Sequence, residues 1–251
     1  MIITAKIVFI APFFIFKTDE RSINPIINIM NTKRLSLLPF LTLIVFLSGC
    51  KKEAMTVTDI DGNTYKTVSI GGKVWMAESL RTTKFRDGSA IPLVAPGNQW
   101  SLTTTAAYSD VNGSADNAPV YGRLYNWYAV ADSRNLCPAG WHVPSNQEYS
   151  DLFTALGGSS VAGGKMKETG TDHWNAPNGG ATNQSGFTGR GAGYINYLGV
   201  FKDFRYITGF WTSTAASASA AYHVGLLFDL PDADNYSVEK RTGLQVRCVK
   251  D

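Results

Sequence analysis

Cys137-Pro-Ala-Gly-Trp-His-Val-Pro-Ser145 carries the strongest structural signal in this chain, and Asn146 to Leu156 follows it directly. Its two prolines favour extended backbone and its glycine permits a turn, so the segment reads as a rigid turn that leads into a helix. Ser145 and Glu148 have the spacing of a capping box, and apolar residues follow at helical spacing. We therefore predict a helix that starts after Ser145 and ends at Gly157-Gly158.

The N-terminal part of the chain resembles a bacterial lipoprotein signal. Lys33 and Arg34 precede an apolar run from Leu35 to Leu47, and Leu47-Ser-Gly-Cys50 resembles a lipobox, whose cysteine is lipidated. The run is too short to cross a hydrocarbon core about 30 Å thick, which disfavours a membrane span. We expect residues 1–29 to be an upstream extension from a misplaced start, with a real segment as the alternative. Residues 30–49 would then be the signal peptide, 50–55 a tether and 56–251 the folded domain.

Charge disfavours a nucleic-acid partner. The chain has 23 basic and 20 acidic residues, of which five basic and two acidic lie before Cys50, so the predicted mature part has 18 of each. Its net charge is zero, and no basic run follows Lys51-Lys52. We therefore expect no nucleic-acid binding, and a membrane contact through the lipid anchor on Cys50.

Three cysteines are present, and lipidation of Cys50 leaves Cys137 and Cys248. Export permits a disulfide between these two, and closing so long a loop stabilises a fold by roughly 4–5 kcal/mol in the chain-entropy model. Two buried free thiols are the alternative. We expect the disulfide, which would tie the central turn to the C-terminal strand.

Short strands and two helices are expected in the rest of the domain. Residues 56–76 read as a three-stranded meander with turns at Asp61-Gly62 and Gly71-Gly72, which tolerate positive φ. Residues 80–117 are polar and read as a long loop, whereas 123–132 has apolar residues at helical spacing and is expected to form the first helix. Short strand-like pieces follow later in the chain. This pattern predicts a single α+β domain.

Seven sequence blocks resemble the Fibrobacter succinogenes major paralogous domain, in the family order and across residues 56–251. The family is related to the formylglycine-generating-enzyme group and to C-type-lectin-like folds, so the resemblance implies a C-type-lectin-like mixed sheet with two helices and long loops. Members are typically exported, often as lipoproteins of Bacteroidetes-like bacteria. The resemblance implies no settled activity, but it favours a surface binding or adhesion module. The blocks are Asp59–Tyr65, Trp75–Leu80, Gly122–Trp127, Leu136–Pro144, Ala181–Phe187, Phe210–Thr214 and Val246–Asp251.

Enzymatic chemistry has little support in the residue pattern. Enzymes related to this family use a cysteine pair for oxidation, whereas Cys137 and Cys248 read as structural. The Gly-x-Ser-x-Gly motif of many hydrolases is absent from the sequence. His142, His173 and His223 are far apart and have no companion metal-binding motif. We therefore expect no catalytic residue, no cofactor and no transition-metal site.

An acidic segment near the C-terminus is a weak candidate for calcium, which takes six to eight oxygen ligands. It lacks the glycine and terminal glutamate of an EF-hand loop, and Pro231 to Asn235 also reads as a solvated hairpin turn. We favour the turn. The candidate ligands are Asp229, Asp232, Asp234 and Asn235.

Aromatic residues in loops rich in Asn, Gly and Thr are better candidates for ligand binding, because their rings stack while polar neighbours form hydrogen bonds. The alternative is that these rings fill the core. We favour the core for Trp211, as for Trp75, Trp127 and Trp141. The candidate ligand-binding residues are Trp174, Asn178, Asn183, Tyr194, Tyr197, Tyr206 and Trp211.

These patterns predict a lipid-anchored extracytoplasmic protein, at the outer membrane or cell surface, that binds a glycan or a protein without catalysis. One alternative is an oxidase of the formylglycine-generating type or a hydrolase on the same scaffold, which would need a free thiol or two converging acids. The other is a structural surface or adhesin subunit, which would present an exposed apolar patch. The sequence does not specify an oligomeric state.

Overall fold

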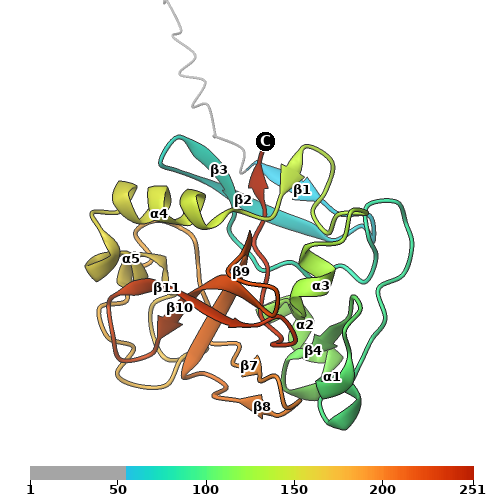
Figure 1. The fold of residues 1–251 in the computed structure, drawn as a ribbon. Coiled ribbons are helices and arrows are strands. Elements are labelled where there is room, and N and C mark those ends of the chain that lie inside the picture. The colour runs from blue at the N-terminus through green and yellow to red at the C-terminus, as the bar shows by residue number, and fades with distance from the viewer. Residues whose placement is uncertain (1–54) are drawn as a thin grey trace, which may run out of the picture. The chain divides into compact units, whose positions relative to one another are not determined.

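Two main sheets and several short helices make up residues 55–251, which the computed structural model describes (Figure 1). The predicted α+β class is confirmed. A five-stranded sheet has the order β1-β2-β3-β12-β6, a three-stranded sheet has the order β11-β10-β9, and two-stranded ribbons join β4 to β5 and β7 to β8. The predicted extension, the predicted signal peptide and the predicted lipidation site Cys50 lie outside the described residues, as does most of the predicted tether.

Most elements are short, and the longest are α4 and β9. None of the helices in residues 55–251 is long and apolar enough to cross a bilayer. The strands are β1 (Thr56–Thr58), β2 (Thr64–Ile70), β3 (Lys73–Met76), β4 (Tyr108–Asp110), β5 (Arg123–Tyr125), β6 (Trp141–His142), β7 (Tyr194–Ile195), β8 (Phe201–Lys202), β9 (Ile207–Ala215), β10 (Ala220–Leu227), β11 (Ala233–Glu239) and β12 (Val249–Lys250). The helices are α1 (Asn98–Leu102), α2 (Ala118–Tyr121), α3 (Trp127–Val130), α4 (Asn146–Ala155) and α5 (Ser159–Met166), with 3-10 turns η1 (Val111–Gly113) and η2 (Ala115–Asn117).

The first sheet contains the predicted meander and closes on the C-terminal strand. β2 pairs antiparallel with β1 and with β3, and the turns place Gly62 and Gly71 at positive φ. β12 lies between β3 and β6, because Val249 pairs with Trp75 on one side and with His142 on the other. The last strand of the chain thus joins the first three strands to the central turn.

The predicted capping box is present at the start of α4. The Glu148 amide donates to the Ser145 hydroxyl (3.2 Å), and the Ser145 amide donates to the Glu148 carboxylate (2.8 Å). Burial raises the pKa of Glu148, but hydrogen bonds from the Ser145 amide, Lys73 and His142 outweigh it and lower the pKa to about 2. The charged carboxylate therefore fixes the helix start against β3 and β6. The buried face of α4 consists of Tyr149, Leu152 and Phe153.

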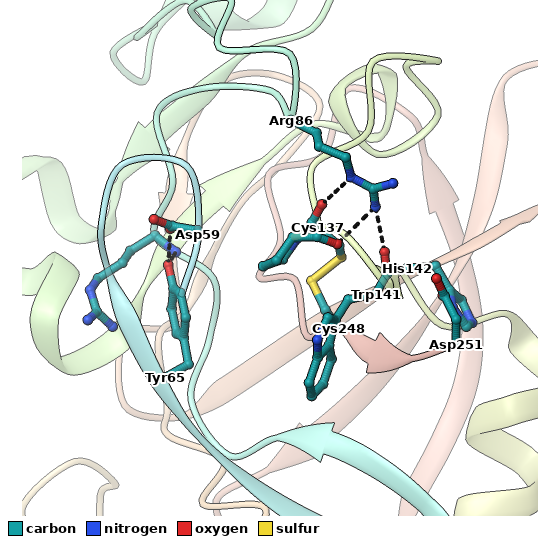
Figure 2. The surroundings of a disulfide bond; sticks show 10 residues. Asp59, Tyr65, Arg86, Cys137, Trp141, His142, Cys248 and Asp251 are labelled. Atoms are coloured by element: carbon teal, nitrogen blue, oxygen red, sulfur yellow. Dashed lines mark hydrogen bonds and ion pairs between the residues drawn. A yellow bond between two sulfur atoms is a disulfide. The ribbon is translucent and has the colours of Figure 1, made fainter. Parts of the chain in front are cut away.

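A disulfide joins Cys137 to Cys248 across 111 residues, with the Cα atoms 5.9 Å apart and both residues buried. The predicted pairing is confirmed, and the alternative of two free thiols is wrong. Figure 2 shows Arg86 beside the bridge, where its guanidinium donates to the carbonyls of Cys137, Pro138 and Trp141. The central turn is therefore held both by a covalent bond and by three carbonyl hydrogen bonds.

The three-stranded sheet has one buried face and one open face. Phe210 and Val224 belong to the buried face and pack in one cluster with Leu152 of α4. Alternate residues of a strand point to opposite faces. On the open face, Gly209 of β9 lies directly opposite Gly225 of β10. This open face forms the candidate site described below.

Residues 123–132 differ from the predicted helix. They form β5 and then the short helix α3, whose first amides the Asn126 side chain caps. Tyr125 exchanges two backbone hydrogen bonds with Leu244 (2.8 and 3.0 Å), so a distant strand partner overrides the helical spacing. The loop predicted for residues 80–117 also contains α1, β4 and both 3-10 turns.

Replacing both bridging cysteines, as Cys137→Ala with Cys248→Ala, is expected to lower the free energy of unfolding by roughly 2–5 kcal/mol, because the unfolded chain regains the entropy of an open loop. Urea unfolding followed by tryptophan fluorescence measures this change. The control is the wild-type protein unfolded without reductant. Equal free energies for the two proteins would mean that the bridge adds nothing to stability.

Candidate functional site

A cavity of about 590 Å³ opens on the free face of the three-stranded sheet. Gly209 and Gly225 leave backbone at the floor of this cavity, and the side chains of Leu244 and Tyr236 pack close to it, 2.8 and 3.3 Å from where a Cβ would stand at each glycine. Apolar side chains from β9, β10, β11 and the segment before β12 surround this floor. We call the cavity the sheet groove; its lining includes Tyr194, Tyr197, Gly209, His223, Gly225 and Tyr236.

Three tyrosines line the sheet groove. Tyr194 and Tyr197 come from β7 and the turn that follows it, and the Ile195 amide anchors this ribbon by donating to the Gly243 carbonyl (3.0 Å). Tyr236 comes from β11. Tyr197 and Tyr236 are 45% and 46% exposed, so both present ring surface on which a ligand can stack.

His223 is the titratable ring inside the groove. It lies between the rings of Trp211 and Tyr236, with centroids 6.2 and 5.8 Å away. Burial lowers its pKa to about 4, so the imidazole is neutral at pH 7. Its Nδ1 atom is buried and has no hydrogen-bond partner within residues 55–251. The neutral imidazole therefore lines the groove as a ring surface next to Tyr236.

The structure brings part of the predicted ligand-binding set together. Tyr194 and Tyr197 line the sheet groove. Trp211 is fully buried, as its core alternative predicts; it lies on the same face of β9 as Gly209, with its ring beside that of His223, and has no exposed surface for a ligand. Tyr206 is 48% exposed, but it packs edge-on against Phe228 (5.0 Å between centroids) and does not line the groove.

Trp174, Asn178 and Asn183 do not fit the predicted role in ligand contact. Trp174 is fully buried, and its indole donates to the Gly189 carbonyl (2.9 Å). Asn178 is buried too, and its amide donates to two loop carbonyls at 2.8 and 2.7 Å. Asn183 forms hydrogen bonds across its own turn. These side chains hold the loops together, because irregular backbone needs side-chain partners for its polar groups.

His223, Tyr236 and the glycine pair were not among the residues predicted to bind a ligand. The glycines did carry a signal, since a glycine inside a strand-like run marks a close approach of another group to the backbone. The signal became specific only through the register, which places Gly209 opposite Gly225 and His223 opposite Tyr236.

A lysine ammonium lies in the loop region of the calcium candidates. The Nζ atom of buried Lys167 donates to the carbonyls of Gly179 (2.8 Å), Leu227 (2.7 Å) and Leu230 (2.8 Å). Burial lowers the pKa of Lys167 to about 8, against the opposing effect of two nearby aspartates. The side chain is therefore still mostly charged at pH 7 and supplies the positive charge that these carbonyls surround.

The calcium candidates have separate surroundings. Within residues 55–251, no three His, Cys, Asp or Glu residues gather as metal ligands. The predicted turn over Pro231–Asn235 is wrong beyond Asp232, because β11 begins at Ala233 and pairs Asp234 and Asn235 with β10. The Asn235 amide donates to the Ser150 hydroxyl of α4 (3.2 Å), while Asp229 is exposed.

His142 lies between two carboxylates, with Nδ1 2.5 Å from Asp251 and Nε2 3.0 Å from Glu148 (Figure 2 shows the His142–Asp251 contact). The Ser145 hydroxyl donates to Glu148 (2.9 Å) and has no hydrogen bond with the imidazole. These groups therefore lack the hydroxyl-to-base contact of an activated nucleophile. They hold the C-terminus against α4.

Comparison with known proteins identifies a family. Residues 68–250 match the family model described as the Fibrobacter succinogenes major domain, which covers most of the chain. No curated protein and no solved structure matches the chain.

Lys167→Met is expected to lower the free energy of unfolding by about 2–4 kcal/mol, because it leaves three carbonyls around a fully buried side chain without their donor. Lys165→Met is the matched control: Lys165 donates to a single carbonyl, that of Leu156 (2.7 Å), and its loss should cost less than about 1 kcal/mol. Urea unfolding of both variants gives the comparison. Similar losses in the two variants would contradict a special role for the Lys167 ammonium.

The lowered pKa of His223 predicts stability that is sensitive to acid. His223 binds a proton near pH 6.5 in the unfolded chain and near pH 4 in the folded chain. The stability that the folded chain gains from the neutral ring is therefore complete above pH 6.5 and is lost as the pH falls through 4. We expect a total loss of roughly 3 kcal/mol. His223→Gln should lose less stability than the wild type over this interval in urea unfolding. Parallel pH profiles for the two proteins would rule out this linkage.

Proposed function

Because the chain belongs to the Fibrobacter succinogenes major domain family, we propose that it is an exported, lipid-anchored binding module for a glycan or protein ligand. The observation that carries this proposal is the sheet groove, a cavity of about 590 Å³ with exposed tyrosines, a backbone floor and an unpaired buried imidazole nitrogen. Ligand pockets commonly have such a mostly apolar lining with a few polar groups that set orientation.

The groove suits a ligand with a flat, partly apolar ring. Tyr197 and Tyr236 offer ring faces, and Gly225 lets the ligand approach the backbone of β10. The Glu239 side chain supplies a hydrogen-bonding group to the groove, and His223 adds a further ring to its lining. A sugar ring, or an aromatic or proline side chain of a protein, meets these requirements.

A protein ligand has one further observation in its favour. The turn between β7 and β8 carries Leu198 and Val200, which are 58% and 46% exposed and follow the groove residue Tyr197. An apolar rim of this kind adds contact area for a protein partner but not for a single sugar. The same exposed apolar rim also favours the alternative of a structural adhesin subunit.

Two observations favour binding over catalysis. Both cysteines of the described domain are joined in a buried disulfide, which removes the thiols that an oxidase of the formylglycine-generating type needs. Within residues 55–251, no carboxylate or hydroxyl hydrogen-bonds to His223, so the groove has no paired base and nucleophile of hydrolase type.

The lipid anchor on Cys50 and a place at the outer membrane or cell surface of a Bacteroidetes-like bacterium belong to the same proposal. In Figure 1, β1 lies near the top of the domain, and β7 and β8 lie at the bottom. The β7–β8 wall of the groove therefore lies at the end of the domain opposite to β1, the strand that follows the proposed tether.

Tyr197→Ala and Tyr236→Ala are each expected to weaken ligand binding by about tenfold or more, because each removes a stacking surface in the groove. The purified protein is first applied to a glycan array and to a peptide array, and hits from either are then measured by titration calorimetry. Tyr206→Ala is the matched control, since Tyr206 is as exposed but lies outside the groove.

A second variant tests the same site without removing a ring. Gly225→Val places new atoms in the groove, where the nearest contact of an added Cβ is the Tyr236 side chain at 3.3 Å, and should block binding while the domain stays folded. If Tyr206→Ala weakens binding as much as the groove variants, or if the groove variants bind normally, the groove is not the ligand site.

A further inference from the structure

A second, smaller cavity of about 90 Å³ is lined mainly by polar and charged side chains, whereas the sheet groove is mostly apolar. None of its lining residues lines the groove. Two of the seven sequence blocks, Trp75–Leu80 and Val246–Asp251, contribute to its walls, and a third, Ala181–Phe187, ends next to it. Its polar and charged lining consists of Lys66, Glu78, Ser79, Thr188, Arg190 and Arg247.

Arg247 is the buried charge in this cavity. It is 1% exposed, and its guanidinium donates only to carbonyls: those of Met76 (3.0 Å), Phe187 (2.8 Å) and Thr188 (3.1 Å). The ring of Phe187 lies 4.4 Å from its Cζ atom. Its Nε atom has no partner within residues 55–251, and burial lowers the pKa of Arg247 to about 9. A buried guanidinium without a hydrogen-bonded carboxylate is costly unless an anion approaches it.

The other charged side chains of the cavity form no ion pair with Arg247. Arg190 is paired with Glu168 (2.9 Å from Nε to Oε1), and Glu168 is also bound by His173. Lys66 is exposed and forms no ion pair within the described residues. The one acid that lines the cavity is Glu78, whose Oε2 accepts the amide hydrogen of Lys66 (2.9 Å). Apart from Arg190, which is paired with Glu168, the cavity is therefore lined by two cations, Lys66 and Arg247, and one carboxylate, that of Glu78.

We propose that this cavity binds a small oxyanion, either a carboxylate or a group of sulfate size. The cavity is several times larger than one water needs, but it is too small for a sugar ring, so it admits a group of four or five heavy atoms. Guanidinium groups suit such anions because they present several N–H donors in one plane. The exposed Lys66 ammonium and the buried Ser79 hydroxyl supply further donors.

Titration of the full mature protein with sodium sulfate and with sodium acetate tests the site, at an ionic strength held constant with sodium chloride. The readout is the ¹H–¹⁵N resonance of the Arg247 Nε–H group, which reports on the cavity directly. We expect a saturable shift. A change that never saturates, or that chloride reproduces, would be a general salt effect and would overturn the proposal.

Lys66→Gln and Ser79→Ala are expected to weaken the anion's affinity by about three- to tenfold, since the first removes a positive charge and the second a hydroxyl donor, and neither residue has a role in the core hydrogen bonds of Arg247. Lys202→Gln, the same charge change on exposed β8, is the matched control and should bind as the wild type does. Equal affinity in Lys66→Gln, Ser79→Ala and Lys202→Gln would place the anion elsewhere and overturn the site.

Two peptide probes distinguish whether the bound oxyanion is a free ion or the terminal carboxylate of a larger ligand. A short glycine peptide with a free C-terminal carboxylate is compared with the same peptide as its amide. Competition with sulfate by the acid alone assigns a terminal carboxylate of a larger ligand, whereas binding of sulfate without such competition assigns a free ion. Because Tyr197→Ala leaves this cavity intact, anion binding in that variant shows that the site is independent of the sheet groove.

Discussion

Irregular backbone must find hydrogen-bond partners, and in this chain cationic side chains supply many of them. Lys167 donates hydrogen bonds to the carbonyls of Gly179 and Leu227. Arg247 donates to three carbonyls near the centre of the domain, and Arg86 donates to those of the central turn. One cation with several N–H donors can satisfy carbonyls that are far apart in the sequence, which a strand ladder cannot. Long loops are thereby held without regular secondary structure.

The C-terminal segment is where most of these constraints meet. Within a few residues, Leu244 pairs with Tyr125, Cys248 closes the disulfide to Cys137, and Val249 joins two strands of the first sheet. Arg247 lies among them and reaches the carbonyls of β3 and of the 187–188 segment. The fold is therefore completed by its last strand, because segments from the whole domain use it as a common partner.

The two cavities follow from different physical causes. The sheet groove exists because two glycines face each other on the open face of a sheet whose other face is packed against α4. The smaller cavity exists beside a guanidinium that hydrogen-bonds only to carbonyls. One is apolar and lined by neutral rings, and the other is cationic. The ligands proposed for the two cavities differ accordingly: a ring for the sheet groove and a small oxyanion for the smaller cavity.

The sequence by itself determined the features that depend on neighbouring residues or on cysteine number. These include the capping box at Ser145 and Glu148, the meander over residues 56–76 and the pairing of the two domain cysteines. Tertiary structure decided the rest. Trp174 and Tyr197 both lie in polar loops, yet one is covered by distant segments and the other is open. Burial of a loop side chain, like the register that sets Gly209 opposite Gly225, depends on contacts between segments far apart in the chain, and local sequence does not encode them.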